Sequence, residues 1–309
     1  MYDAAASQRL ENKLGYELWF LDFLCTKEEV FDLGQPSSTI RLSNKSSAAA
    51  VEIQLFGSLH RESVDAFRPL AFSVAFKVLD AIHEWILEEN QLGGVIPNVP
   101  WRFAQKVAVF KAQPIQGPDL FRNHSFLGDY AFALYETLLP FRNEVIHNHR
   151  FQVSGDTLRI TAATGTGTQT LDITQVALGS LALVSLTIAR MLLSAVAADE
   201  PRLRLIKYHL DQIVQLHGKA AFGQQRPLLT NVVLTVDLDE SGLFKVALDR
   251  VREAVSRTHH DADLWFNLTV VGSVGEKTTA TWRFPAVQVP NTPMLELRVG
   301  EYEEYRVRS

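Results

Sequence analysis

The sequence predicts an α+β protein: an N-terminal α-helical bundle with a small β-hairpin insertion over residues 1–198, then a smaller α+β C-terminal domain over residues 199–309. Three observations support this. The chain has 309 residues, 47% of them hydrophobic and 21% charged, which is enough for two ordinary cores and too apolar for disorder. Apolar residues recur every three or four positions through most of the first region. The second region contains short strand-like runs.

The first half of the N-terminal region contains helix-like segments separated by a polar break. Residues 8–24 place leucines on one helix face, and residues 32–47 are rich in Gly, Pro, Ser and Asn, as in a loop. Apolar spacing over residues 47–89 predicts either two helices or one helix kinked at Pro69. The glycine pair at 93–94 and the prolines that follow should end this segment.

The second half of this region continues with helical and strand-like segments. Residues 126–149 have a helical apolar register, with a kink expected at Pro140. Over residues 151–163, apolar residues alternate with polar ones on either side of Ser-Gly-Asp, a pattern that predicts a β-hairpin. The tract TGTGTQT at 164–170 is expected to be a flexible connector into a long apolar helix over residues 173–198.

The C-terminal region alternates helices with strands. A helix is expected from Pro201 to about Leu216 and another from Leu243 to Arg257. Strands are expected at residues 231–238, 263–272, 277–284 and, as an edge strand, 294–299. No repeat at a solenoid period is present.

Composition and the apolar segments indicate a cytoplasmic protein. The N-terminus lacks the basic and apolar pattern of a secretion signal. Cys25 is the single cysteine, so an internal disulfide and a cysteine-rich zinc site are excluded. Residues 173–198 are long enough to cross a membrane, but Arg190 would lie in the hydrocarbon, where a central charge costs roughly 2.5–3.5 kcal/mol. A buried core helix is therefore expected, with Arg190 reaching outward along its stem.

The candidate catalytic residues are Arg142, Asn143 and His147, within LLPFRNEVIHNHRF. Asn143 and His147 are four residues apart and share a helix face, which the long Arg142 side chain can reach. Arginine suits a phosphate, histidine transfers protons near neutral pH, and asparagine can orient an imidazole or a substrate oxygen. This set is adequate for metal-independent RNA cleavage in which the ribose 2′-hydroxyl is the nucleophile.

A purely structural role is the alternative for these residues. Histidine and arginine are favoured near helix C-termini, so His147 would cap the helix. Arg142 would then form a surface ion pair with Glu136 or Glu144.

The string RNEVIH at the end of a long helix resembles the motif of the HEPN superfamily (higher eukaryotes and prokaryotes nucleotide-binding domain). That motif is an arginine, commonly followed by a polar residue, and a histidine after four to six residues, which places Arg142, Asn143 and His147. The resemblance implies a helical bundle, often dimeric, with two motifs facing each other. It also implies a metal-independent RNase of a toxin–antitoxin, phage-defence or RNA-processing system. The added hairpin and C-terminal domain depart from the commonest small members.

Other patterns are less specific. The tripeptide His147-Asn148-His149 spells H-N-H, but nucleases of that name are defined by a dispersed metal constellation. Gly165 and Gly167 lack the remaining residues of a dinucleotide or P-loop motif. A solvated loop is favoured over a metal site for the cluster His259, His260, Asp261 and Asp263. No metal or cofactor is therefore predicted.

A basic strip is a further candidate for RNA contact. It would consist of Trp101 with Arg102, Lys106 and Lys111, although such spacing also fits a solvated helix face. The formal charge of −5 supplies no overall attraction to phosphate backbones, so any such contact must be local.

Two functions are expected from these observations. The first is an endoribonuclease acting on RNA as a homodimer, with an antitoxin or a regulatory protein as a further candidate partner. The second is a non-catalytic dimerisation or scaffold protein whose C-terminal domain binds a ligand or a protein.

Overall fold

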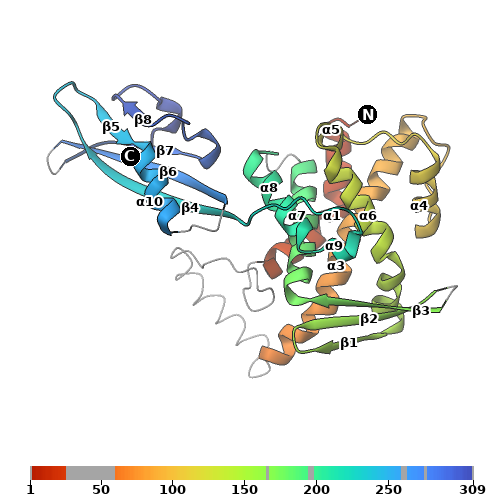
Figure 1. The fold of residues 1–309 in the computed structure, drawn as a ribbon. Coiled ribbons are helices and arrows are strands. Elements are labelled where there is room, and N and C mark those ends of the chain that lie inside the picture. The colour runs from red at the N-terminus through yellow and green to blue at the C-terminus, as the bar shows by residue number, and fades with distance from the viewer. Residues whose placement is uncertain are drawn as a thin grey trace. The chain divides into compact units, whose positions relative to one another are not determined.

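A computed structural model gives the fold of the chain (Figure 1). It describes residues 2–25, 60–164, 167–193, 198–258, 263–274 and 277–307. The loop expected at 32–47 and the start of the segment expected at 47–89 lie outside these residues. The described chain contains both helices and strands, as the α+β prediction requires.

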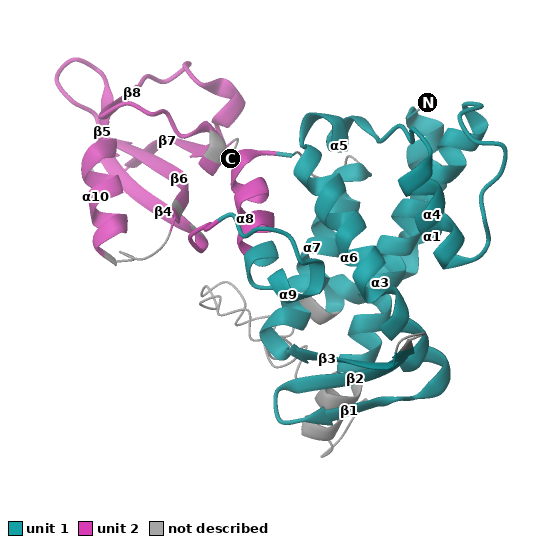
Figure 2. Cartoon of the chain, turned by 45° about the vertical axis from the view of Figure 1, so that its right-hand side comes forward, with its two compact units in different colours: residues 1–198, 209–222 teal, residues 199–208, 223–309 magenta. Residues whose placement is uncertain are grey.

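The chain divides into two compact units (Figure 2). The first unit comprises residues 1–198 and 209–222, and the second comprises residues 199–208 and 223–309. The sequence suggested a single division after residue 198. The structure instead divides helix α8 (Glu200–Asp211) between the units and assigns the segment after it to the first unit.

Helices form most of the first unit. They are α1 (Ala4–Cys25), α3 (His60–Leu92), α4 (Phe103–Ala112), α5 (Asp119–Asn123), α6 (Ser125–Asn143), the π-helix η2 (Glu144–Asn148), α7 (Gln175–Leu192) and α9 (Val214–His217). Helix α3 is continuous through Pro69, so the segment does not divide into two helices at this proline, while residues 47–59 of the expected segment lie outside the described residues. It ends at Leu92, directly before the glycine pair, as expected.

The core of the first unit is built around α3, which contacts α1, α6 and α7. Leu10 and Leu14 of α1 are fully buried, as the leucine spacing predicts. Among the described residues, α7 is the one helix long and apolar enough to cross a membrane, and most of it is buried inside the unit. Arg190 extends from α7 to form an ion pair with Asp22 of α1 at 2.8 Å.

A three-stranded antiparallel sheet lies where α3 begins and α6 ends. Its order is β1 (Phe151–Ser154), β2 (Thr157–Thr164) and β3 (Gly167–Thr174), and Gly155, with φ of +60°, occupies the β1–β2 turn. The flexible connector expected at 164–170 is wrong for the described residues of this tract, because Thr164 ends β2 and residues 167–170 belong to β3, which pairs with β2 along its length. Threonine is a good strand former, and Leu171 and Ile173 bury alternate positions of β3. The glycines obscured this pattern.

The described residues of the second unit form two sheets. Strands β4 (Pro227–Asp237), β6 (Asp263–Val274) and β7 (Lys277–Phe284) form one sheet, in which β4 is parallel and β7 antiparallel to β6. Strands β5 (Phe244–Ala247) and β8 (Met294–Leu297) form an antiparallel pair. Helix α10 (Leu248–Thr258) lies between β5 and β6 in the sequence.

The start expected for α10 is wrong by five residues. The helix was predicted from Leu243, but residues 244–247 form β5, in which Phe244 and Val246 point into the core. These two residues pack with aromatic and aliphatic side chains of the large sheet, namely Phe266, Leu268, Val270, Ala280, Trp282 and Phe284. The edge strand expected near 294 is confirmed as β8.

Candidate active site

The candidate site lies at the end of α6, where the helix widens into the π-helix η2. The His149 N–H bonds to the Glu144 carbonyl five residues back, and His149 ends the turn with φ of +51°. Residues five apart are about 140° apart around a regular α-helix, whereas the i→i+5 bonds of a π turn bring them closer to alignment. The wide turn therefore favours a meeting of Arg142 and His147.

The structure brings all three predicted residues together. Arg142 Nη1 lies 3.0 Å from His147 Nε2 and donates to Asn143 Oδ1 at 3.0 Å. A guanidinium has no acceptor, so Nε2 must accept and the imidazole is neutral with its proton on Nδ1. His147 and Asn143 are exposed, while Arg142 is half-buried. The lone pair of a neutral histidine thus lies at the surface beside a fixed positive charge.

The ring of Phe103, at the start of α4, packs against the guanidinium of Arg142. The Arg142 Cζ atom lies 5.0 Å from the centre of the Phe103 ring, a cation–π distance. Burial lowers the pKa of Arg142, and the nearby Asp80 and Tyr135 act in the opposite direction. An arginine nevertheless remains charged at neutral pH. Its charge is therefore fixed, and its orientation is set by an aromatic ring.

A polar cluster behind the site holds α3, α4 and α6 together. Asp80 of α3 accepts hydrogen bonds from the Tyr135 hydroxyl at 2.9 Å and from Lys106 Nζ at 3.1 Å. Lys106 also pairs with Glu84, and its side chain is only 3% exposed. Lys106 lies one turn after Phe103 on α4. The ion pairs of this buried lysine therefore hold in place the helix whose first residue, Phe103, contacts the Arg142 guanidinium.

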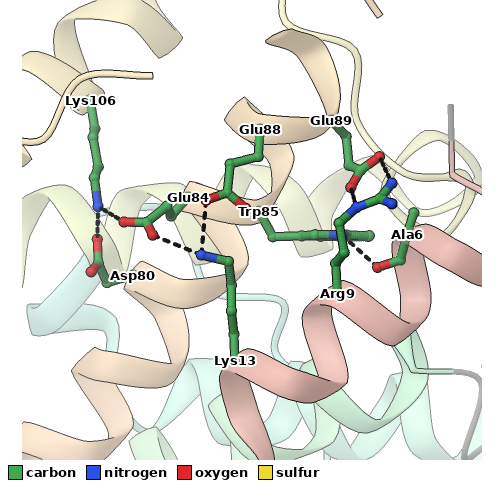
Figure 3. Close-up of polar contacts among 9 residues, drawn as sticks. All are labelled: Ala6, Arg9, Lys13, Asp80, Glu84, Trp85, Glu88, Glu89 and Lys106. Atoms are coloured by element: carbon green, nitrogen blue, oxygen red, sulfur yellow. Dashed lines mark hydrogen bonds and ion pairs between the residues drawn. The ribbon is translucent and has the colours of Figure 1, made fainter. Parts of the chain in front are cut away.

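Ion pairs between α1 and α3 extend this cluster (Figure 3). Lys13 bridges Glu84 at 2.8 Å and Glu88 at 2.9 Å. Arg9 binds the buried Glu89 through two hydrogen bonds of 2.7 Å, the bidentate geometry that arginine favours. Figure 3 shows Glu84 between the two lysines, so α1 and α4 are connected through one carboxylate of α3.

The ion pairs proposed in the structural alternative do not form. Glu136 pairs with Lys111, and Glu144 accepts from Asn148 Nδ2 at 2.9 Å and lies 3.7 Å from Arg150. Within the described parts of the chain, Arg142 has no ion pair. Its guanidinium is therefore available to an external anion.

The expected basic strip is only partly present. Lys106 is buried in the cluster and Lys111 is paired with Glu136, so neither belongs to an open basic surface. Trp101 is 79% exposed, and the Arg102 guanidinium lies 4.9 Å from its ring centre. An amphipathic window cannot distinguish a lysine that faces solvent from one that reaches a buried carboxylate.

Sequence reasoning missed the residues that support the site. Phe103, Asp80 and Tyr135 come from three helices, and each has the appearance of an ordinary core or surface position in its own segment. No local signal marks them, because their role depends on how α3, α4 and α6 pack.

No group of three or more His, Cys, Asp or Glu residues with metal-binding geometry occurs among the described residues. His259, His260 and Asp261 lie outside them, and Asp263 forms an ion pair with Arg204 at 2.8 Å. Of the two glycines considered for nucleotide binding, Gly167 begins β3 and Gly165 is outside the described residues.

Comparison of the chain with known protein families, curated protein sequences and solved structures found no match. The HEPN resemblance thus rests on the Arg142–His147 motif and its position at a helix end.

Proposed function

We propose that the protein is a metal-independent endoribonuclease of the HEPN type, acting in the cytoplasm as a toxin or phage-defence effector. The observation that carries the proposal is the 3.0 Å contact between the Arg142 guanidinium and the exposed Nε2 atom of His147. A fixed cation and a neutral imidazole at one surface point supply phosphate binding and proton transfer.

In the proposed reaction both residues change partners when RNA binds. The substrate 2′-hydroxyl takes the place of the Arg142 N–H at His147 Nε2 and gives its proton to that atom. The O2′–P bond forms and the P–O5′ bond breaks, which leaves a 2′,3′-cyclic phosphate on the upstream fragment. Arg142 moves onto the phosphate oxygens and stabilises the charge that develops there. Asn143 keeps the guanidinium oriented.

The leaving O5′ requires a proton, and we propose that a second copy of the chain provides it. One His147, in its neutral form, acts as base, and its symmetry mate, in the protonated imidazolium form, gives its proton to O5′, while two Arg142 side chains bracket one phosphate. A two-fold contact through the first unit is the simplest way to duplicate the motif. An antitoxin or regulatory protein would control such a dimer.

The main test compares site variants with a matched histidine control. Arg142→Ala and His147→Ala should reduce cleavage of total cellular RNA by about 10²- to 10⁴-fold, with nearly unchanged thermal stability, because His147 is exposed and Arg142 has no ion pair within the described parts of the chain. His149→Asn should retain activity, since His149 lies outside the contact and asparagine tolerates its positive φ. The proposal would be contradicted if the wild-type protein did not cleave RNA, or if the Arg142→Ala and His147→Ala variants cleaved it at the wild-type rate.

A second test separates this mechanism from metal-dependent cleavage. Activity should persist in excess chelator, the upstream product should carry a 2′,3′-cyclic phosphate, and DNA should resist cleavage because it lacks the 2′-hydroxyl. Loss of activity in chelator that Mg²⁺ restores would rule the mechanism out.

A third test addresses the dimer. Light scattering over a dilution series should show a dimer, and mixed Arg142→Ala and His147→Ala subunits should reveal whether two chains share one site. A monomer that cleaves RNA at full rate per chain would refute the shared site.

The scaffold alternative has one observation in its favour, an exposed aromatic row on α1. Tyr16 and Trp19 are 69% and 63% exposed, and the Trp19 and Phe23 rings stack at 5.9 Å. Such a row suits a protein partner. On this alternative Trp19→Ala would weaken self-association while the His147→Ala variant behaves as wild type in every assay.

A further inference from the structure

Trp101 is the most exposed of the large hydrophobic side chains in the described residues, at 79%. The Arg102 guanidinium lies 4.9 Å from its ring centre and forms no ion pair with any described residue. An open indole beside an unneutralised cation differs from Tyr16 and Trp19, the other exposed large aromatics among the described residues of the first unit, which lie against other rings.

The chain places this pair next to the candidate active site. Phe103 directly follows Arg102 in the chain, and the Arg142 Cζ atom lies 5.0 Å from the centre of the Phe103 ring. Consecutive Cα atoms are about 3.8 Å apart, so the Trp101 Cα lies within roughly 7.6 Å of the Phe103 Cα. The indole therefore extends from a residue only two positions before the one whose ring contacts the Arg142 guanidinium.

The residues that follow Trp101 are packed against α3. Phe103 packs edge-to-face on the buried Phe76 at 6.1 Å, and Lys106, one turn later, is held by Asp80 and Glu84. The beginning of α4 is thus fixed to α3 by an aromatic contact and by buried ion pairs. A base that stacks on Trp101 would meet a preformed surface and lose little to ordering of the protein.

We propose that Trp101 and Arg102 form a nucleotide subsite, in which the indole stacks on an unpaired base and Arg102 contacts the adjoining phosphate. This inference rests on the proposed endoribonuclease function and adds a substrate class, single-stranded RNA or unpaired loops. Aromatic rings stack on bases of any sequence, and bases within a duplex are already stacked on each other. Two guanidinium groups and one indole then bind two successive nucleotides.

The experiment measures binding separately from cleavage. The full-length His147→Ala chain is titrated against a fluorescein-labelled single-stranded RNA of mixed sequence and against its duplex, with anisotropy as the readout. Adding Trp101→Ala should weaken single-strand binding about 5- to 100-fold, whereas Trp101→Phe should retain most of it. Arg102→Ala should weaken binding and lower the slope of log K against log salt concentration by about one.

Trp19→Ala is the matched control, because Trp19 is also an exposed tryptophan of the first unit but lies on α1. Equal binding by the Trp101→Ala and Trp19→Ala proteins, or equal affinity for duplex and single strand, would overturn the subsite. Cleavage assays use the protein in which His147 is retained. In that protein, Trp101→Ala should raise the KM for RNA with little change in kcat.

The two proposals fail in different ways. Cleavage by wild-type protein with unchanged KM in Trp101→Ala would overturn the subsite and leave the ribonuclease standing. Trp101-dependent binding of single strands without cleavage would support the subsite and overturn the ribonuclease.

Discussion

Replacing Lys106 by methionine tests whether the buried polar cluster stabilises the first unit. The change removes the ammonium group and keeps an unbranched side chain that suits a helix. Breaking a buried ion pair typically costs 3–5 kcal/mol, because the remaining charge loses its partner. Here Asp80 keeps the Tyr135 hydroxyl and Glu84 keeps Lys13 at 2.8 Å. We therefore expect a loss of roughly 2–3 kcal/mol at pH 7.

The effect should depend on pH in a defined direction. Burial raises the pKa of Glu84, but its bonds to Lys106 and Lys13 outweigh that effect, so the pKa is lowered overall. A carboxyl group with a lowered folded pKa contributes stability above its unfolded pKa, and that contribution is lost as the pH falls through the folded value. The difference between wild type and Lys106→Met should therefore narrow below about pH 4.5.

The assay is hydrogen–deuterium exchange on peptides of α3 at increasing urea, which reports on the first unit rather than on the whole chain. Lys111→Met is the matched control, because Lys111 lies on the same helix but forms an exposed pair with Glu136. It should cost less than about 1 kcal/mol. A Lys106→Met protein as stable as the control, or a deficit of equal size at pH 7 and at about pH 3.5, would refute the reasoning.

Three further predictions concern packing and buried polar groups. Gly272→Ala would place a Cβ atom 2.9 Å from ring carbons of the fully buried Phe244, so we expect a loss of about 1–3 kcal/mol in urea unfolding. Adding Phe244→Leu should recover part of it, and strictly additive losses would count against the clash. Burial lowers the pKa of His83 in the folded protein to about 4 from its ordinary value of 6.5. Between these two pH values the unfolded chain binds a proton at His83 that the folded chain does not, so the free energy of unfolding falls from pH 6.5 to pH 4 by at most about 3 kcal/mol. His83→Phe should flatten that part of the stability profile, and an unchanged slope would contradict this. Trp85→Phe removes the 2.9 Å bond from the buried indole to the Ala6 carbonyl and should cost about 1–3 kcal/mol by thermal unfolding, whereas no loss would mean that water replaces the indole.

Periodicity predicted the long elements of the fold. Helices α1, α6 and α7 and strands β6 and β7 lie close to the segments expected for them, because each has a regular apolar pattern of its own. Strand β3 was missed since its first half, Gly-Thr-Gln-Thr, begins with glycine and contains no apolar residue. Strand β5 was missed because its four residues lead directly into the amphipathic pattern of the following helix.

The candidate site was predicted in part for the same reason. Arg142, Asn143 and His147 are close in sequence, so their meeting follows from local geometry, even though the π turn itself left no visible signal. The support from Phe103 and Asp80 depends on tertiary packing, which local patterns do not encode. The assignment of residues 209–222 to the first unit is similar, because an amphipathic helix does not indicate which core it faces.

The π turn at 144–148 also bears on how this segment tolerates insertions and deletions. Removing one residue between Asn143 and Ile146 would let the helix rewind as a regular α-helix, with arginine and histidine four apart and about 40° from alignment. The pair would still meet, and the chain would leave the helix in nearly the same direction, because a π turn accommodates one extra residue within almost the same rotation. Arg150, whose carbonyl accepts from Thr161 at 3.2 Å, and strand β1 beyond it would then keep their places. The π turn therefore lets this segment lose one residue without moving either the Arg–His pair or the sheet.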